Sequence, residues 1–244
     1  MKRIALALFI LLTCPGFVAA QSINLDLGAG GGSTTARLVQ LTALITLLSL
    51  APSLLVMVTG FTRIVIVLSL LRGAIGAQGT PPNIVLIGLA MFLTYFVMQP
   101  ALDQAWTTGL LPMTTGQLGE LEGMQRAAEP FRAFMASNVK PDDLRMFLDL
   151  AHIPPPANID ATAWRALIPA FLVGELRRAF EIGFLLYLPF LVIDMVVASV
   201  LMSLGMMMLP PNVVSLPFKL IFFVLVDGWR LVCGSLVQSF GPSG

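Results

Sequence analysis

Four long apolar runs determine the environment in which this chain can fold. They cover residues 38–71, 84–102, 182–209 and 213–240. A transmembrane helix needs about 20 predominantly apolar residues, and each run approaches or exceeds that length. No strand-like alternation of apolar and polar residues persists along the chain. We therefore predict an all-α membrane protein built from long kinked helical hairpins.

The composition supports a membrane or multi-subunit environment. Hydrophobic residues make up 57% of the chain and charged residues only 11%, whereas about 25% of the residues in a soluble domain are charged. Such a chain cannot cover a globular surface with polar groups, so lipid or other protein must surround it. The net charge of +1 predicts no nucleic-acid partner. The single histidine, His152, has no cysteine or second histidine nearby, so we predict no metal site and no cofactor.

The first twenty residues are typical of a secretory signal peptide. Lys2 and Arg3 precede an apolar core, and the small residues that signal peptidase prefers end at Ala20. We predict cleavage after Ala20, which would leave residues 21–36 as a flexible, glycine-rich tail. An uncleaved anchor helix at 1–20 is the alternative.

The predicted signal sets the predicted topology. Cleavage leaves the new N-terminus outside, so residues 37–102 form a first helical hairpin that enters and leaves the membrane. The charged residues of 103–181 then form a small helical periplasmic domain, and residues 182–240 form a second hairpin. In this four-span arrangement the turn at 72–83 and the methionine loop at 205–211 face the cytoplasm.

Two segments of the predicted periplasmic domain have helical patterns. These are residues 122–138 and residues 141–152, which end just before a run of prolines. Asp142 and Asp143 favour a helix N-terminus at the start of the second segment, because acidic groups there complement the helix dipole.

Four charged residues, Arg63, Asp194, Lys219 and Asp227, lie within the apolar runs. A charge at the bilayer centre costs about 2.5–3.5 kcal/mol on insertion scales. These groups are therefore expected to form inter-helix ion pairs, to face a neighbouring subunit, or to line a polar pathway. Asp194 is the best candidate for a functional or assembly-critical charge, and Arg63 has the further alternative of snorkelling near a helix end.

Prolines in the same runs predict broken or kinked helices. Pro52, Pro189 and Pro217 each remove a helical hydrogen-bond donor and free a carbonyl group. In lipid these groups must be satisfied by protein or water. Hairpins that pack against copies of themselves in a ring would meet this requirement.

Three consecutive methionines, Met206, Met207 and Met208, lie at a chain reversal between Gly205 and two prolines. Methionine is flexible and fills irregular gaps. Repeated around a ring of subunits, such loops would form a deformable apolar plug, since hydrophobic constrictions close pores by dewetting. The alternative is that these side chains are buried contacts at a hairpin tip.

Three blocks of the sequence resemble a known family. FTRIVIVLSLLRGAIGAQGTPPNIVLIGLAMFLTYFVM (61–98), the segment from PAFLVGELRRAF to GMMMLPP (169–211) and SLPFKLIFFVLVDGWRLV (215–232) are similar to conserved blocks of the flagellar biosynthetic protein FliP family. The resemblance covers most of the chain after the predicted signal. Gly174 departs from it, because serine is usual at that place in the family.

The resemblance implies a function. Members of the family are pore-forming core subunits of the flagellar type III protein export gate, which exports flagellar proteins across the bacterial inner membrane and is needed for flagellum assembly. They are not enzymes. The family's methionine gasket corresponds to Met206, Met207 and Met208.

The resemblance also implies partners. Several copies would assemble with FliQ and FliR into a helical, pentamer-like pore within the MS ring of the flagellar basal body. FlhA, FlhB and the export ATPase complex would be further partners, and unfolded protein the cargo. Much of this complex lies above the membrane plane, so four spans describe insertion better than the assembled state.

Two other functional classes stay open on the residues alone. A small-solute transporter would need a midplane site, often within inverted repeats, and no repeat is visible. A membrane enzyme would need a catalytic motif, and the chain has no G-x-S-x-G, H-E-x-x-H or P-loop pattern. The charged group Glu175, Arg177, Arg178 and Glu181 lies at the predicted domain–membrane junction and is a candidate for contacts with a neighbouring subunit.

Overall fold

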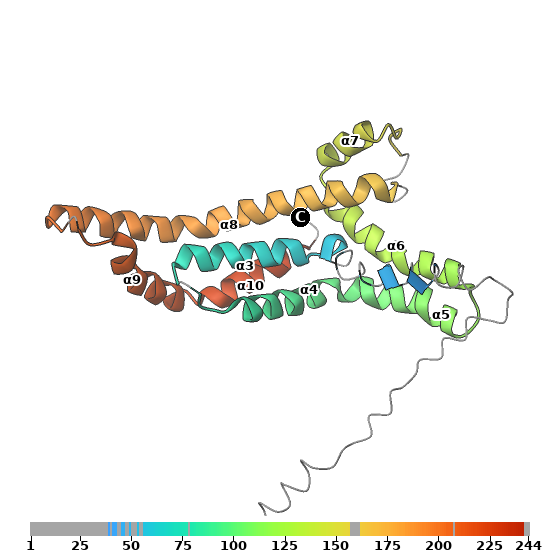
Figure 1. Ribbon diagram of the computed structural model, residues 1–244, viewed down its shortest axis with the longest axis horizontal. Coiled ribbons are helices and arrows are strands. Elements are labelled where there is room, and N and C mark those ends of the chain that lie inside the picture. The colour runs from blue at the N-terminus through green and yellow to red at the C-terminus, as the bar shows by residue number, and fades with distance from the viewer. Residues whose placement is uncertain are drawn as a thin grey trace, which may run out of the picture. The chain divides into compact units, whose positions relative to one another are not determined.

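The structure is a computed structural model that describes residues 39, 41–42, 45–46, 49, 53, 56–77, 79–156, 162–206 and 208–241. The regular structure within these residues is helical throughout, which confirms the predicted all-α class (Figure 1). The chain divides into two units, Met1–Leu47 and Leu48–Gly244. The predicted signal peptide and tail, as well as Pro52, lie outside the described residues. The elements of the second unit are α3 (Phe61–Ile75), α4 (Asn83–Ala105), the π-helix η1 (Trp106–Leu110), α5 (Leu111–Thr114), α6 (Glu120–Asn138), α7 (Pro141–Leu150), α8 (Trp164–Ser203), α9 (Pro211–Leu225) and α10 (Gly228–Gln238).

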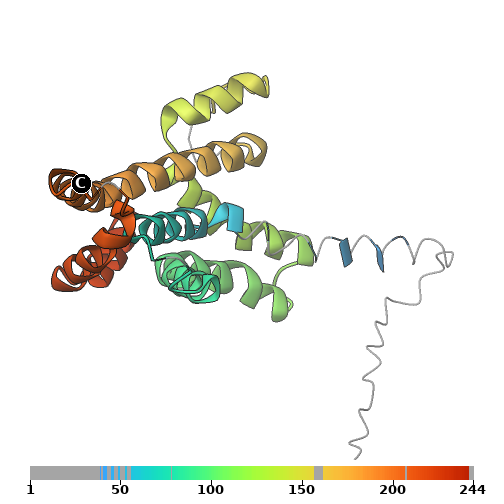
Figure 2. The same ribbon diagram turned by 60° about the vertical axis from the view of Figure 1, so that its left-hand side comes forward.

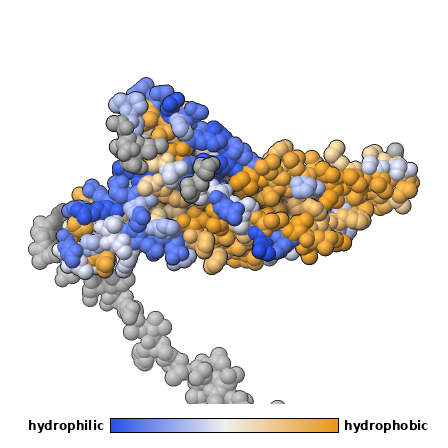
Figure 3. Space-filling view, turned by 180° about the vertical axis from the view of Figure 1, so that it is seen from behind, coloured by the Kyte–Doolittle hydropathy of each residue, from blue (hydrophilic) through white to orange (hydrophobic). Residues whose placement is uncertain are grey.

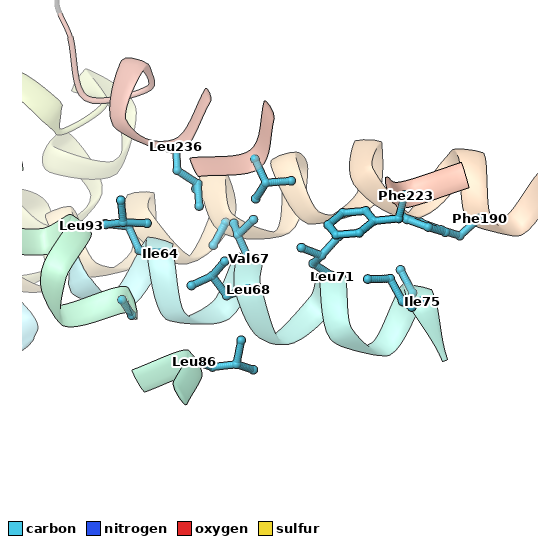
Figure 4. Close-up of a cluster of buried hydrophobic side chains, with 14 residues drawn as sticks. Ile64, Val67, Leu68, Leu71, Ile75, Leu86, Leu93, Phe190, Phe223 and Leu236 are labelled. Atoms are coloured by element: carbon cyan, nitrogen blue, oxygen red, sulfur yellow. The ribbon is translucent and has the colours of Figure 1, made fainter. Parts of the chain in front are cut away.

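Helix α3 is the central helix of the larger hydrophobic cluster. Ile64, Val67, Leu68 and Leu71 recur at the spacing of one helix face and are completely or almost completely buried. Figure 4 shows these side chains among residues of α4, α8, α9 and α10. The chain reverses after α3 at Gly76, whose φ of 78° is readily adopted by glycine.

Helix α3 by itself is shorter than a membrane span. The helix has 15 residues, about 22 Å at 1.5 Å per residue, against a bilayer core of about 30 Å. The first apolar run is interrupted at Thr59 and Gly60, just before α3 begins. The sequence predicts four spans, but the described residues contain two helices long and apolar enough to cross a membrane, Asn83–Thr114 and Trp164–Ser203, or up to three if α9 and α10 count as one broken span.

Prolines within the apolar runs do not end the helices that contain them. Pro100, near the end of the second run, lies inside α4, which continues to Ala105. Pro189 and Pro217 likewise lie inside α8 and α9. Packing of each helix against its neighbours outweighs the one hydrogen bond that a proline removes. The predicted boundary between residues 181 and 182 falls within α8, which runs across it as one helix.

The fourth apolar run is broken between α9 and α10 and not at Pro217. Helices α9 and α10 are bent by 63° at the residues between them. Asp227 adopts the left-handed conformation there, with φ of 51°. A Cβ atom on Gly228 would lie 2.2 Å from the Phe223 ring, and Trp229 packs edge-on against the same ring with centroids 5.4 Å apart. The close approach at Gly228 therefore allows the bend, which returns α10 toward α4.

A second hydrophobic cluster joins α6, α7 and the N-terminal part of α8. Its buried members include Met135, Leu144, Leu148, Leu167 and Phe171. Figures 1 and 2 both place α7 alongside the N-terminal part of α8. Both helices predicted in this region are confirmed, as α6 and α7, with Asp142 and Asp143 in the first turn of α7. Figure 3 shows hydrophilic side chains gathered over this region and hydrophobic ones over the C-terminal part of α8 and α9.

Candidate functional site

Arg63 and Glu175 form an ion pair that is sealed from solvent. Their side chains are 0% and 1% exposed. Arg63 Nε donates to Glu175 Oε2 at 2.8 Å, and Nη2 donates to Oε1 of the same carboxylate. This two-point geometry matches a guanidinium to a carboxylate and is the strong form of such a pair.

The remaining nitrogen of Arg63 connects the pair to the segment after α10. Arg63 Nη1 donates to the carbonyl oxygen of Ser239 at 2.7 Å and to its hydroxyl oxygen at 2.8 Å. The guanidinium also lies over the ring of Phe240, 3.7 Å from the centroid. One arginine thus joins α3, α8 and the end of α10.

The sequence predicts pairing or snorkelling for Arg63, but it does not predict this partner. Glu175 is 112 residues away and is assigned from the sequence to possible subunit contacts. No local pattern connects the two positions. The pair could have been found from the rule that a buried charge needs an opposite charge. Glu175 is the acidic residue on the face of α8 that packs on α3.

Asp194 and Lys219 form a second ion pair, between α8 and α9. Lys219 Nζ donates to Asp194 Oδ2 at 2.6 Å and to the carbonyl oxygen of Ala74 at 3.1 Å. Ser215 Oγ donates to Asp194 Oδ1 at 2.5 Å. Ala74 belongs to the last turn of α3, where carbonyl groups lack helical partners and favour a cation. The pair therefore fixes α9 to α8 and to the C-terminal end of α3.

The second pair borders a larger cavity and is less completely buried than the first. A cavity of about 1210 Å³ is lined by Arg72, Asn83, Tyr187, Asp194 and Lys219, among other residues. The Asp194 side chain is 21% exposed. Asp194 and Lys219 therefore pair with each other, which is one of the predicted alternatives, and they also border a cavity, whereas the polar pathway stays a prediction.

Asp227 lies apart from both pairs. Its carboxylate is 3.9 Å from Arg230 Nη1, and both side chains are largely exposed. Exposed pairs of this kind contribute little to stability. The structural role of Asp227 is at the bend between α9 and α10, where its backbone adopts the left-handed conformation.

The charged group predicted at the domain–membrane junction mostly has partners within the chain. Apart from Glu175, Arg177 Nη2 donates to Asp143 Oδ1 at 2.7 Å, and Glu181 lies 3.6 Å from Lys140 Nζ. Both contacts link α8 to the segment that begins α7. Arg178 lines a cavity of about 590 Å³ beside Arg63 and has no ion pair among the described residues.

The methionine loop connects α8 to α9. Met206 and Met208 lie between these helices with 48% and 98% of their surface exposed. Met207 lies outside the described residues. The two described methionines are therefore not buried by this chain itself, and their side chains are available to another surface.

Metal-binding geometry is not found among the described residues, in which no three His, Cys, Asp or Glu side chains converge. His152 is exposed and lies in the turn that follows α7.

Residues 44–236 match the model of the FliP family. The chain belongs to this family. It is 57% identical over 227 residues to the flagellar biosynthetic protein FliP of Caulobacter vibrioides, covering 93% of this chain and 85% of the relative. It is 47% identical over 244 residues to FliP of Agrobacterium fabrum, covering 98% and 100%. It is 48% identical over 202 residues to FliP of Bacillus subtilis, covering 83% and 91%. The part that matches the FliP family contains both buried ion pairs and the whole methionine loop.

Proposed function

We propose that this chain is a pore-forming core subunit of the flagellar type III protein export gate. In this role it is needed to export flagellar proteins across the inner membrane and to assemble the flagellum. Membership of the FliP family supports a part in flagellar biosynthesis and export. The observation that carries the pore-forming role is the exposure of Met206 and Met208 between two apolar helices.

The exposed apolar faces of the chain support assembly with other subunits. Large hydrophobic side chains are exposed along α4, α8 and α9, among them Phe92, Phe96, Phe184, Met195 and Phe218. Contiguous apolar patches of this kind indicate a protein or membrane contact. We propose that copies of the chain, in a pentamer-like arrangement with FliQ and FliR, cover these faces in the flagellar basal body. FlhA, FlhB, the export ATPase complex and the MS ring complete the proposed set of partners.

In such an assembly the methionine loops would close the pore. Thioether side chains are flexible and polarisable, so a ring of them packs without a fixed shape. Water leaves a narrow apolar constriction, which blocks ions when no cargo is present. An unfolded polypeptide could then displace the side chains as it passes, and they would close again behind it.

The proposed role requires binding and movement but no bond-breaking step by this chain. The charged side chains nearest the methionine loop, Asp194 and Lys219, hold three helices together through hydrogen bonds. We therefore assign this subunit no enzymatic activity.

The methionine loop can be tested in cells that lack the chromosomal copy of the gene. A variant with Met206, Met207 and Met208 changed to alanine should assemble and export flagellar filament protein, but should let small solutes leak across the inner membrane. The matched control changes Met124 and Met146, which lie on α6 and α7 rather than in the loop or on the apolar faces of α4, α8 and α9, to alanine. An assembled loop variant with no more leakage than the control would show that the plug proposal is wrong, and normal swimming without the gene would overturn the export role.

A further inference from the structure

The cavity beside Asp194 and Lys219 has an excess of positive charge. Its lining contains two cations, Arg72 and Lys219, and one carboxylate, that of Asp194. Lys219 and Asp194 neutralise each other through their 2.6 Å contact. Arg72 Nη1 donates to Asn83 Oδ1 at 2.5 Å and to the carbonyl oxygen of Pro81 at 3.3 Å, but neither acceptor is charged. The cavity therefore has one uncompensated guanidinium.

Two helices begin at this cavity and add to its positive potential. Asn83 at the start of α4 and Asn212 and Val213 at the start of α9 belong to the lining. Neither helix has a side-chain cap or an acidic residue in its first turn. The first N–H groups of a helix lack helical acceptors and carry a partial positive charge. They therefore favour an anionic ligand, as Arg72 does.

The lining also leaves room for an occupant close to the backbone. A Cβ atom on Gly73 or Gly79 would meet no other atom within 4 Å, and both glycines border the cavity. The hydroxyl groups of Ser69, Thr80 and Tyr187 provide further hydrogen-bonding groups around the space.

The neighbouring surface is apolar rather than polar. Ile84 and Val85 on α4 and Val213 on α9 are large exposed hydrophobic residues at the helix ends that form the cavity. A ligand that satisfied both features would carry an anionic group for the cavity and hydrocarbon for these helix faces.

We propose that this cavity binds the phosphate group of an anionic phospholipid, whose acyl chains contact Ile84, Val85 and Val213 at the starts of α4 and α9, outside the faces assigned above to subunit contacts. Basic pockets between membrane-spanning helices are a recognised type of headgroup site, and a guanidinium binds phosphate through parallel hydrogen bonds. The bound lipid would neutralise Arg72 and hold the starts of α4 and α9 near the end of α3. This site goes beyond the proposed export function and does not depend on it.

The test measures lipid retention by the full chain purified in detergent. Native mass spectrometry after incubation with phosphatidylglycerol or phosphatidylcholine would count the lipids bound. We expect one phosphatidylglycerol to bind about tenfold more tightly than phosphatidylcholine, the size of effect that one charge-assisted contact provides. Arg72→Gln should abolish this preference, and Arg72→Lys should keep part of it. Arg230→Gln, at an exposed arginine on α10 outside the cavity, is the matched control and should leave it unchanged.

A second variant tests the cavity without changing a charge. Gly73→Leu places a side chain in open space and should displace the lipid while the chain stays folded, as checked by its melting temperature. Binding of soluble glycerol phosphate is measured in parallel, because this compound carries the phosphate group without the hydrocarbon chains. A preference for phosphatidylglycerol that survives both Arg72→Gln and Gly73→Leu would overturn the proposal. Arg72-dependent binding of glycerol phosphate without binding of phosphatidylglycerol would also overturn it, because the site would then be one for soluble phosphates. A protein segment that fills the cavity in the assembled gate would exclude a lipid there.

Discussion

The two inter-helix ion pairs of this FliP-family chain have the same chemistry and differ in how completely they are buried. Arg63 and Glu175 are 0% and 1% exposed between α3 and α8, and the donors of Arg63 reach Glu175 and Ser239. Asp194 and Lys219 also join helices, but the Asp194 side chain is 21% exposed and the pair borders a cavity of about 1210 Å³. Burial of both partners makes the first pair a fixed structural contact, whereas the exposed part of Asp194 leaves room for water or a ligand at the second.

The difference predicts how much each pair matters for stability. When one partner of an enclosed pair is removed, the other charge is left without water and costs about 3–5 kcal/mol. The Asp194 side chain is partly exposed, so the second pair is less desolvated and the loss of one partner costs less. Glu175→Ala and Asp194→Asn test this difference, and two further variants have smaller expected effects.

Glu175→Ala should be the most destabilising of the four. It leaves Arg63 buried without an opposite charge, and we expect the free energy of unfolding to fall by about 3–5 kcal/mol. Denaturant unfolding in detergent, followed by circular dichroism, measures the change. The double variant Arg63→Met/Glu175→Leu removes both charges and should recover much of the loss. A double variant as unstable as the single one would contradict the ranking.

Asp194→Asn should have a smaller effect of the same sign. The amide keeps an oxygen for Ser215 or Lys219 but loses the charge, and Lys219 keeps the carbonyl oxygen of Ala74 as an acceptor. We expect a loss of about 1–3 kcal/mol, the range for a hydrogen bond to a charged group. The same unfolding measurement applies, with cellular export measured in parallel. A loss equal to that of Glu175→Ala would show that the partial exposure of Asp194 does not lower the cost of losing this pair.

Gly174→Ser should stabilise the chain. Asp143 pairs with Arg177 through Oδ1, but its buried Oδ2 has no hydrogen-bond partner in the structure. A Cβ atom on Gly174 would lie 3.7 Å from that oxygen, which places a serine hydroxyl within donating distance. We expect a gain of about 1.5 kcal/mol, of which about 1 comes from this bond and about 0.5 from the better helix propensity of serine over glycine. Gly174→Ala is the control and should gain about 1 kcal/mol from propensity alone, since alanine is the better helix former. A serine variant less stable than the alanine one would contradict the predicted bond.

Asp227→Asn should produce the smallest change, with no measurable loss of stability. The contact with Arg230 is exposed at both ends, and such pairs contribute little. Asparagine also tolerates the left-handed conformation that the bend requires. The melting temperature should match that of the parent chain. Asp227→Val, which does not tolerate this conformation, should lower it; equal melting of the two variants would show that the backbone conformation at Asp227 is unimportant.

Local features of the chain were predictable because they depend on neighbouring residues. Helices α6 and α7 follow from their apolar spacing and from Asp142 and Asp143, and the turn between α3 and α4 follows from its glycines and prolines. The resemblance to the FliP family was visible in the order of residues within three blocks, and the family match confirms it.

The bend at Asp227 and the passage of α4 through Pro100 were not predictable in this way. A proline is a strong local signal for a helix end, but neighbouring helices decide whether the helix continues. Asp227 and Gly228 carry a weak local signal, and the ring of Phe223 against Gly228 decides the bend. The roles proposed for Met206 to Met208 stay predictions from the sequence, supported by the exposure of Met206 and Met208.

By itself, the order of residues determined the helical class, the need for an apolar environment and the requirement that buried charges find partners. Only the tertiary structure decided that Arg63 meets Glu175, that Lys219 meets Asp194, and that both partners of the first pair are buried while Asp194 of the second is partly exposed. The physical reason is that helix formation and hydrophobicity act over a few residues, whereas each ion pair forms only after distant helices have packed.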